Sequence, residues 1–124
     1  MISLNVYKLL HILGILLVFS SFGALVLHAL NGGTKATNGG RRLVTISYGF
    51  GLFLILLGGF GMLARLGIVQ GGLPGWIWFK LILWVAIGGL LALPYRMPGA
   101  SRLLWLLGPA IGMLAAWAGL YKPF

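Results

Sequence analysis

The chain has no aspartate, no glutamate and no cysteine among its 124 residues. Without cysteine, a disulfide framework, a thiolate nucleophile and iron–sulfur ligation are excluded. Without carboxylate side chains, one chain cannot supply paired-carboxylate catalysis, a hard-cation cage or a serine triad closed by an acid. Charge is scarce overall, since charged residues make up only 7% of the sequence. These kinds of site are therefore excluded within one chain.

Apolar residues dominate what is present. The sequence is 60% hydrophobic and has a mean hydropathy of +1.07, so it cannot provide the charged surface that a soluble domain of this size needs. Three uncharged runs, 9–30, 43–64 and 103–121, are each long enough to cross a hydrocarbon core of about 30 Å at ~1.5 Å per residue. A fourth run, 76–93, contains Lys80 as its single charge. The composition predicts an integral membrane protein with four spans.

The fold class that we predict is all-α: a polytopic membrane protein forming an antiparallel up-down bundle of four transmembrane helices. Residues 1–124 form a single domain, with spans at about 4–30, 43–66, 76–93 and 102–121. The connections are short, so consecutive helices should be antiparallel neighbours. The first span is longer than the apolar region of a cleaved signal, which indicates a retained helix.

Glycines recur inside the last three predicted helices. In membrane bundles, small residues allow two helix backbones to approach closely. We therefore expect these glycines at helix contacts, although a glycine facing a flat cofactor is an alternative. They are Gly58, Gly59, Gly61, Gly88, Gly89, Gly108 and Gly112.

The net charge of +9 would suggest nucleic acid in a soluble protein. Here most basic residues lie at helix ends, where they meet lipid phosphates, so the expected partner is the lipid bilayer and nucleic acid is rejected. One side of the bundle is expected to carry five basic residues and the other side three, which favours both termini outside the cytoplasm of a bacterial inner membrane. The five are Lys35, Arg41, Arg42, Arg96 and Arg102; the three are Lys8, Arg65 and Lys122.

Two ionisable residues are expected at the same depth in the membrane. Lys8 should reach the interface, which puts His11 about one helical turn beneath it. Lys80 follows the interfacial anchor Trp76 by one turn, starting from the same surface. His28 lies 17 residues beyond His11, about 25 Å further along the helix, and its role stays open. His11 and Lys80 are therefore predicted to face each other across the bundle.

Lys80 has several possible partners. Its long stem can carry the ammonium group to the head groups, or Trp76 and Trp84 can hold it by cation–π contact. Alternatively, it binds an anion that is not a side chain of this sequence. The candidates are a lipid phosphate, a cofactor propionate, a group on a partner chain, and the C-terminal carboxylate of Phe124. An ionisable group inside a membrane is a functional candidate because burying it is costly.

His11 is the candidate ligand for a metal. Neutral histidine is a common axial ligand of haem iron, so His11, with Gly14 one turn further on, is a candidate to hold haem b. The competing interpretation is a histidine that only makes a structural hydrogen bond. Copper or other metal transport is disfavoured, since two histidines about 25 Å apart cannot share one ion.

Four segments together resemble a known family. They are "YKLLHILGILLVF", "RRLVTISYGFGLFLILLGG", "GWIWFKLILWV" and the terminal "YKPF". They resemble the HemJ family of small integral membrane proteins, which are assigned as protoporphyrinogen IX oxidases, and related copper-resistance proteins of the CopD type. The resemblance implies bound haem b. It makes His11 and Lys80 catalytic and cofactor-binding residues, His11 the metal ligand, and Arg42 a further cofactor-binding residue.

The same resemblance implies an oxidoreductase that acts on a tetrapyrrole in porphyrin and haem biosynthesis, or a protein of membrane electron transfer. Its electrons would pass to quinone or a respiratory partner, since the sequence contains no flavin or nicotinamide motif. A second hypothesis belongs to another class: a non-catalytic small subunit or scaffold of a larger membrane complex, or a homo-oligomer. Whether the protein is an enzyme stays open at this point.

Overall fold

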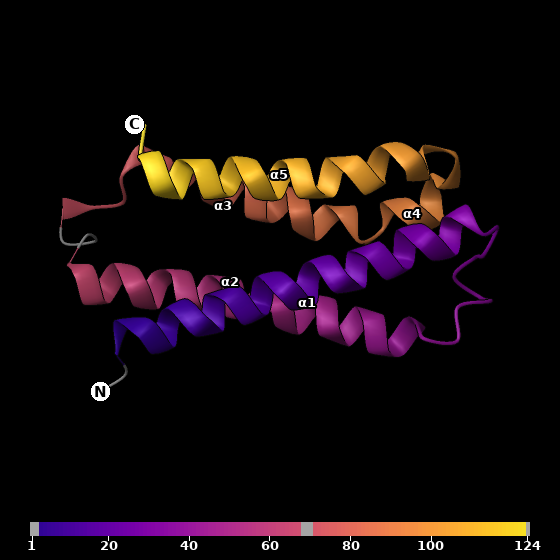
Figure 1. Cartoon of the computed structure of the whole chain (residues 1–124), viewed down its shortest axis with the longest axis horizontal. Coiled ribbons are helices and arrows are strands. Elements are labelled where there is room, and N and C mark those ends of the chain that lie inside the picture. Colours follow the sequence, from indigo (N-terminus) through magenta and orange to yellow (C-terminus); the bar gives the residue numbers. More distant parts are fainter. Residues whose placement is uncertain (1–2, 68–70, 124) are drawn as a thin grey trace.

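The computed structural model describes residues 3–67 and 71–123, and these residues form helices and connecting turns without a strand. The helices lie roughly along one axis (Figure 1). The elements are α1 Leu4–Leu30, α2 Arg41–Leu66, α3 Gly75–Leu90, α4 Leu93–Arg96, the short 3-10 helix η2 Pro98–Ala100, and α5 Ser101–Tyr121.

The chain turns back at the end of each long helix. Figure 1 shows α1 crossing α2 as one pair, while α3 and α5 form the other. The start of α1, the end of α2, the start of α3 and the end of α5 lie at one end of the bundle, which we call the terminal end. The segments 31–40 and 91–100 lie at the other, which we call the loop end. The all-α, up-down bundle predicted from the sequence is therefore found.

The helix boundaries follow from local chemistry. Ser3 caps α1, because its hydroxyl accepts a 3.3 Å hydrogen bond from the backbone N–H of Val6, a donor that would otherwise lack a partner. α2 ends at Gly67, whose φ of 72° lies in the left-handed region that glycine adopts without steric cost. The first span is found at the predicted residues, and the second begins two residues earlier than predicted.

The predicted third span, 76–93, is wrong at its C-terminal end. α3 stops at Leu90, and a separate helical turn, α4, begins at Leu93 and has Pro94 as its second residue. Pro94 has no N–H to donate to the Leu90 carbonyl, and its ring would clash with that carbonyl in a continuous helix. The helix therefore breaks before the proline, not at it.

Glycines bring α1 and α2 into backbone contact. A Cβ atom on Gly14 would lie 2.6 Å from the carbonyl oxygen of Gly51, and one on Gly51 would lie 2.8 Å from the carbonyl oxygen of Gly14. At Gly58 a Cβ would lie 2.6 Å from the backbone nitrogen of His11. No side chain fits at these three positions, so α1 and α2 pack at the short distance that small residues permit.

The other predicted packing glycines divide into two groups. Gly61, Gly108 and Gly112 receive aromatic rings of α1 (Tyr7, Phe22 and Phe19 respectively), each closer than 3 Å to where a Cβ would stand. Gly88 and Gly89 do not mark a close helix contact: a Cβ would meet only a Leu52 side-chain atom at 3.7 Å in the first case and nothing within 4 Å in the second. The expected helix contacts are thus found at Gly61 in α2 and at both glycines of α5. The expectation is wrong for the two glycines of α3.

Side-chain hydrogen bonds join α2 to α3. The fully buried Tyr48 donates its hydroxyl to the carbonyl of Ile87, and the Trp84 indole N–H donates to the carbonyl of Leu52 over 3.0 Å. Each polar tip thus finds an acceptor within the apolar interior, as buried hydroxyl and indole groups require. Around Tyr48, the buried core gathers side chains from α1, α3 and α5: Val18, Phe22, Val26, Ile87, Leu90 and Leu104.

Within residues 3–67 and 71–123, three helical segments are long and apolar enough to cross a membrane: Leu4–Leu30, Arg41–Leu66 and Pro98–Tyr121. Only 17% of the most apolar window in the last segment is buried inside the protein, so most of its leucines and both its tryptophans are exposed on the outside of the bundle, as lipid contact requires. These features indicate an integral membrane protein. The remaining helix, α3, has 16 residues and is about 24 Å long, which is shorter than a typical span.

Candidate functional site

His11 is held in one orientation by α2. Its Nδ1 lies 2.8 Å from the carbonyl oxygen of Ile55. A carbonyl can only accept, so Nδ1 carries the proton of this bond, and in the neutral ring Nε2 has the free lone pair. A ring nitrogen bonded to a backbone carbonyl is the usual way in which a protein orients a histidine that binds a metal through its other nitrogen.

Glycines make room for this ring. Gly58 allows the α1 backbone to reach α2 at His11, and a Cβ on Gly59 would lie 3.6 Å from Cε1 of the imidazole, at van der Waals distance. The space around Gly14 is different, because the backbone of α2 fills it. Gly14 therefore belongs to the α1–α2 contact, and Gly59 is the glycine that flanks the imidazole.

The hydrogen bonds between α2 and α3 set the depth of Lys80. Ile87 lies level with Tyr48, and Trp84 lies level with Leu52. One further helical turn along both antiparallel helices brings Lys80 level with residues 55 and 56 of α2. Ile55 is the residue whose carbonyl binds His11. The two residues therefore lie at one depth.

The Lys80 side chain is half-buried and runs over α5. Its Nζ lies 3.0 Å from the place that a Cβ of Gly119 would occupy, so this glycine leaves space for the ammonium group. Lys80 therefore stands where α3 and α5 meet.

The predicted cation–π partners of Lys80 are wrong in their assignment. It is Lys122 whose Nζ lies over the ring of Trp76, 5.3 Å from the centroid. Trp84 uses its indole N–H on the Leu52 carbonyl, which fixes that ring against α2. The i−4 and i+4 spacing within α3 relates Lys80 only to tryptophans of its own helix. It cannot show that Lys122, the residue after α5, lies over the ring of Trp76.

One predicted site residue lies away from this place, and one candidate partner of Lys80 lies outside the described residues. Arg42 is the second residue of α2, so it lies 13 residues from Ile55 and about 20 Å along the helix from His11. Phe124, whose carboxylate was a candidate partner of Lys80, lies outside the described residues.

His28 has a structural environment at the loop end. Its Nε2 lies 2.8 Å from the carbonyl oxygen of Thr34, and it lies 3.4 Å from the Thr37 hydroxyl. Gly33 packs against the ring, since a Cβ there would lie 2.3 Å from it. His28 therefore ties the segment after α1 back onto the helix.

A scan against protein-family models, a search of curated proteins and a search of solved structures return no match for this chain. The chemistry of the site must therefore be argued from its own residues. Within the described residues no group of three or more histidine, cysteine or acidic side chains could hold a bare metal ion. The candidate ligand-binding groups of this site are therefore one oriented imidazole, His11, and one half-buried ammonium group, Lys80, at the same depth.

Proposed function

We propose that this protein is a HemJ-like membrane protein that binds haem b at His11 and Lys80 and acts in porphyrinogen oxidation or membrane electron transfer. The observation that carries the proposal is the hydrogen bond from His11 Nδ1 to the Ile55 carbonyl. It leaves Nε2 as the coordinating atom and keeps the ring from turning. A haem would need only one nitrogen from this protein, and His11 would supply it.

The roles of the two residues follow from their chemistry. His11 would hold the iron through Nε2. Lys80, level with it, would pair with a propionate of the cofactor or of a tetrapyrrole substrate, and an ion pair is stronger in a low-dielectric interior than in water. The bound haem would supply a centre that accepts and passes on single electrons.

Protoporphyrinogen oxidation releases six electrons and six protons, which three quinone molecules would take up as three quinols. In this scheme Lys80 positions the acidic edge of the substrate, and the apolar helices admit the hydrophobic ring from the bilayer. Arg42 lies toward the loop end of α2, so in this scheme it would contact only the far edge of a ligand held by His11.

The proposal includes the placement of the chain in a bacterial inner membrane, with both termini outside the cytoplasm. α3 would then be a fourth span. Its 16 residues would be extended at the loop end by α4 and anchored at the terminal end by Trp76, since tryptophan favours the interface. A short span is accommodated by local thinning of the bilayer.

The test is the visible spectrum of the purified protein. We expect a Soret band in the wild type that is lost in His11→Ala and kept in His28→Ala, the matched control, because His28 is engaged with Thr34. Porphyrinogen turnover should fall in Lys80→Gln and persist in Lys8→Gln, which removes a charge at the terminal end. A colourless wild type that stays colourless when haem is added would contradict the proposal, and a stable colourless complex with larger subunits would select the scaffold hypothesis.

A further inference from the structure

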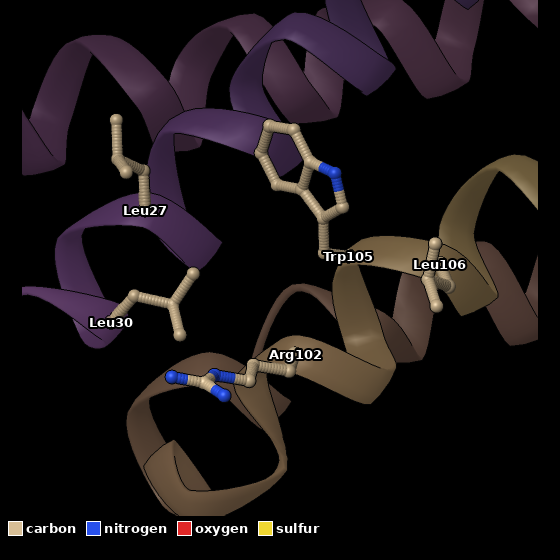
Figure 2. A pocket seen from close by; sticks show the side chains of 5 residues that line it. All are labelled: Leu27, Leu30, Arg102, Trp105 and Leu106. Atoms are coloured by element: carbon tan, nitrogen blue, oxygen red, sulfur yellow. The ribbon is translucent and has the colours of Figure 1, made fainter.

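A groove opens on the side of the bundle at the loop end. It has a volume of about 310 Å³ and is lined by Leu27, Leu30, Arg102, Trp105 and Leu106. This volume is at the lower limit of small-molecule sites in proteins. Figure 2 shows that the two leucines of α1 form one wall and that Trp105 and Arg102 come from α5. The groove is distinct from the His11 and Lys80 site, which lies toward the other end of the bundle.

The walls of the groove face the lipid. Leu27 is 52% exposed, Trp105 is 51% exposed and Leu106 is 68% exposed. In a membrane helix, apolar side chains with this exposure contact acyl chains. The Trp105 ring lies beside α1 at Gly23, where a Cβ would be 3.8 Å from it, so α1 and α5 both border this wall.

The groove ends at the level of the head groups. Leu30 is the last residue of α1, and Arg102 is the second residue of α5, so both stand where the two helices leave the apolar layer. Trp105 and Leu106 lie three and four residues beyond Arg102 and share its face of the helix. The groove therefore has a cation at its polar end and an apolar floor that leads about one turn into the membrane.

Charge decides which occupant suits this site. The loop end carries four further basic residues, and the positive end of the α5 dipole lies beside Arg102. The sequence has no acidic residue, so a second copy of this chain would bring no carboxylate side chain to Arg102. A phosphodiester accepts paired hydrogen bonds from a guanidinium group, and its acyl chains match the apolar floor.

We propose that this groove is a binding site for an anionic phospholipid, with the phosphate on Arg102 and an acyl chain along Leu27 and Leu106. A lipid of net negative charge is preferred over a zwitterionic one, because an ammonium head group would meet the basic residues of the loop end. The bound lipid would bridge α1 and α5 on the side of the bundle where they meet.

The experiment compares phosphatidylglycerol with phosphatidylcholine, each added to the purified protein in mild detergent, with native mass spectrometry to count bound lipids. We expect the wild type to retain one phosphatidylglycerol in preference to phosphatidylcholine. Arg102→Gln should reduce that retention about fivefold, the effect of removing one basic residue near the surface. Arg41→Gln, which removes an exposed charge at the same end, should leave it unchanged.

Leu27→Trp keeps the cation and fills the groove, so it should also reduce retention; Leu106→Trp serves the same purpose should that variant fail to fold. Equal retention of both lipids by the wild type would overturn the proposal. So would equal losses in Arg102→Gln and Arg41→Gln, which would indicate attraction by general charge. A dimer that Leu27→Trp dissociates would assign the groove to a second copy of the chain.

Discussion

At the scale of single residues, polar side chains in this bundle find their partners in backbone carbonyls. His11 is bonded to Ile55, Tyr48 to Ile87 and Trp84 to Leu52. A chain without acidic side chains has few other acceptors inside a membrane. These carbonyls belong to regular helices and keep a lone pair for a second donor. The arrangement orients each ring without placing a charge in the interior.

The bond from Tyr48 to Ile87 leads to a prediction about stability. Tyr48→Phe keeps the buried ring and removes only the hydroxyl, so we expect the free energy of unfolding to fall by about 1 kcal/mol, the usual net contribution of one hydrogen bond. Tyr121→Phe is the control, because Tyr121 is 74% exposed whereas Tyr48 is fully buried. The measurement is unfolding of both variants in mixed detergent micelles.

An equal change in the two variants would show that the hydroxyl of Tyr48 contributes nothing to the contact between α2 and α3. A loss confined to Tyr48→Phe would support that contact, and with it the register that puts Lys80 level with His11.

At the scale of helices, the close packing of α1 against α2 depends on glycines, which have no side chain to separate the two backbones. Gly51 faces both the Gly14 carbonyl and Val18, with a Cβ position less than 3 Å from each. Gly51→Ala should force the two helices apart and lower the free energy of unfolding by about 1–3 kcal/mol, the usual cost of overpacking. The measurement is again unfolding in mixed micelles.

Gly49→Ala is a matched control in the same helix, since a Cβ on Gly49 meets nothing within 4 Å. Alanine has the higher helix propensity, so this change should be neutral or stabilise α2 by up to about 1 kcal/mol. A Gly51→Ala variant as stable as Gly49→Ala would contradict the close backbone contact.

The helices were largely predictable from the sequence, and the places where prediction failed have physical causes. Long uncharged runs define α1, α2 and α5, because their length and apolarity alone require a span. The end of α3 was missed because Pro94 acts on a carbonyl four residues earlier, so the helix stops at Leu90 although the apolar run continues.

The site was predictable in part for similar reasons. Depth counting from Lys8 and Trp76 put His11 and Lys80 at one level, because rise per residue is constant in a helix. The acceptor of His11 was not predictable, since it is the backbone of Ile55 and any side chain there would present the same carbonyl. Nor did the pattern within α3 show that Lys122, from another segment, would make the cation–π contact with Trp76.

At the scale of the whole molecule, the arrangement in the membrane depends on whether α3 crosses it. The chain has no cysteine, so single cysteines can be introduced without a background. Gly39, Gly71 and Gly99 lie in three successive connections, and a Cβ at each meets nothing within 4 Å. Replacing them one at a time by cysteine should leave the fold intact.

Labelling of intact cells with a membrane-impermeant maleimide then reports the side of each connection. If α3 is a span, the cysteine at position 71 should react from outside, while those at 39 and 99 should react only after the membrane is opened, since the loop end carries more basic residues and favours the cytoplasm. Reaction at 39 and 99 from outside, with 71 protected, would keep four spans and invert the orientation. Equal accessibility of 71 and 99 would contradict a fourth span, because the connections before and after α3 would then lie on one side.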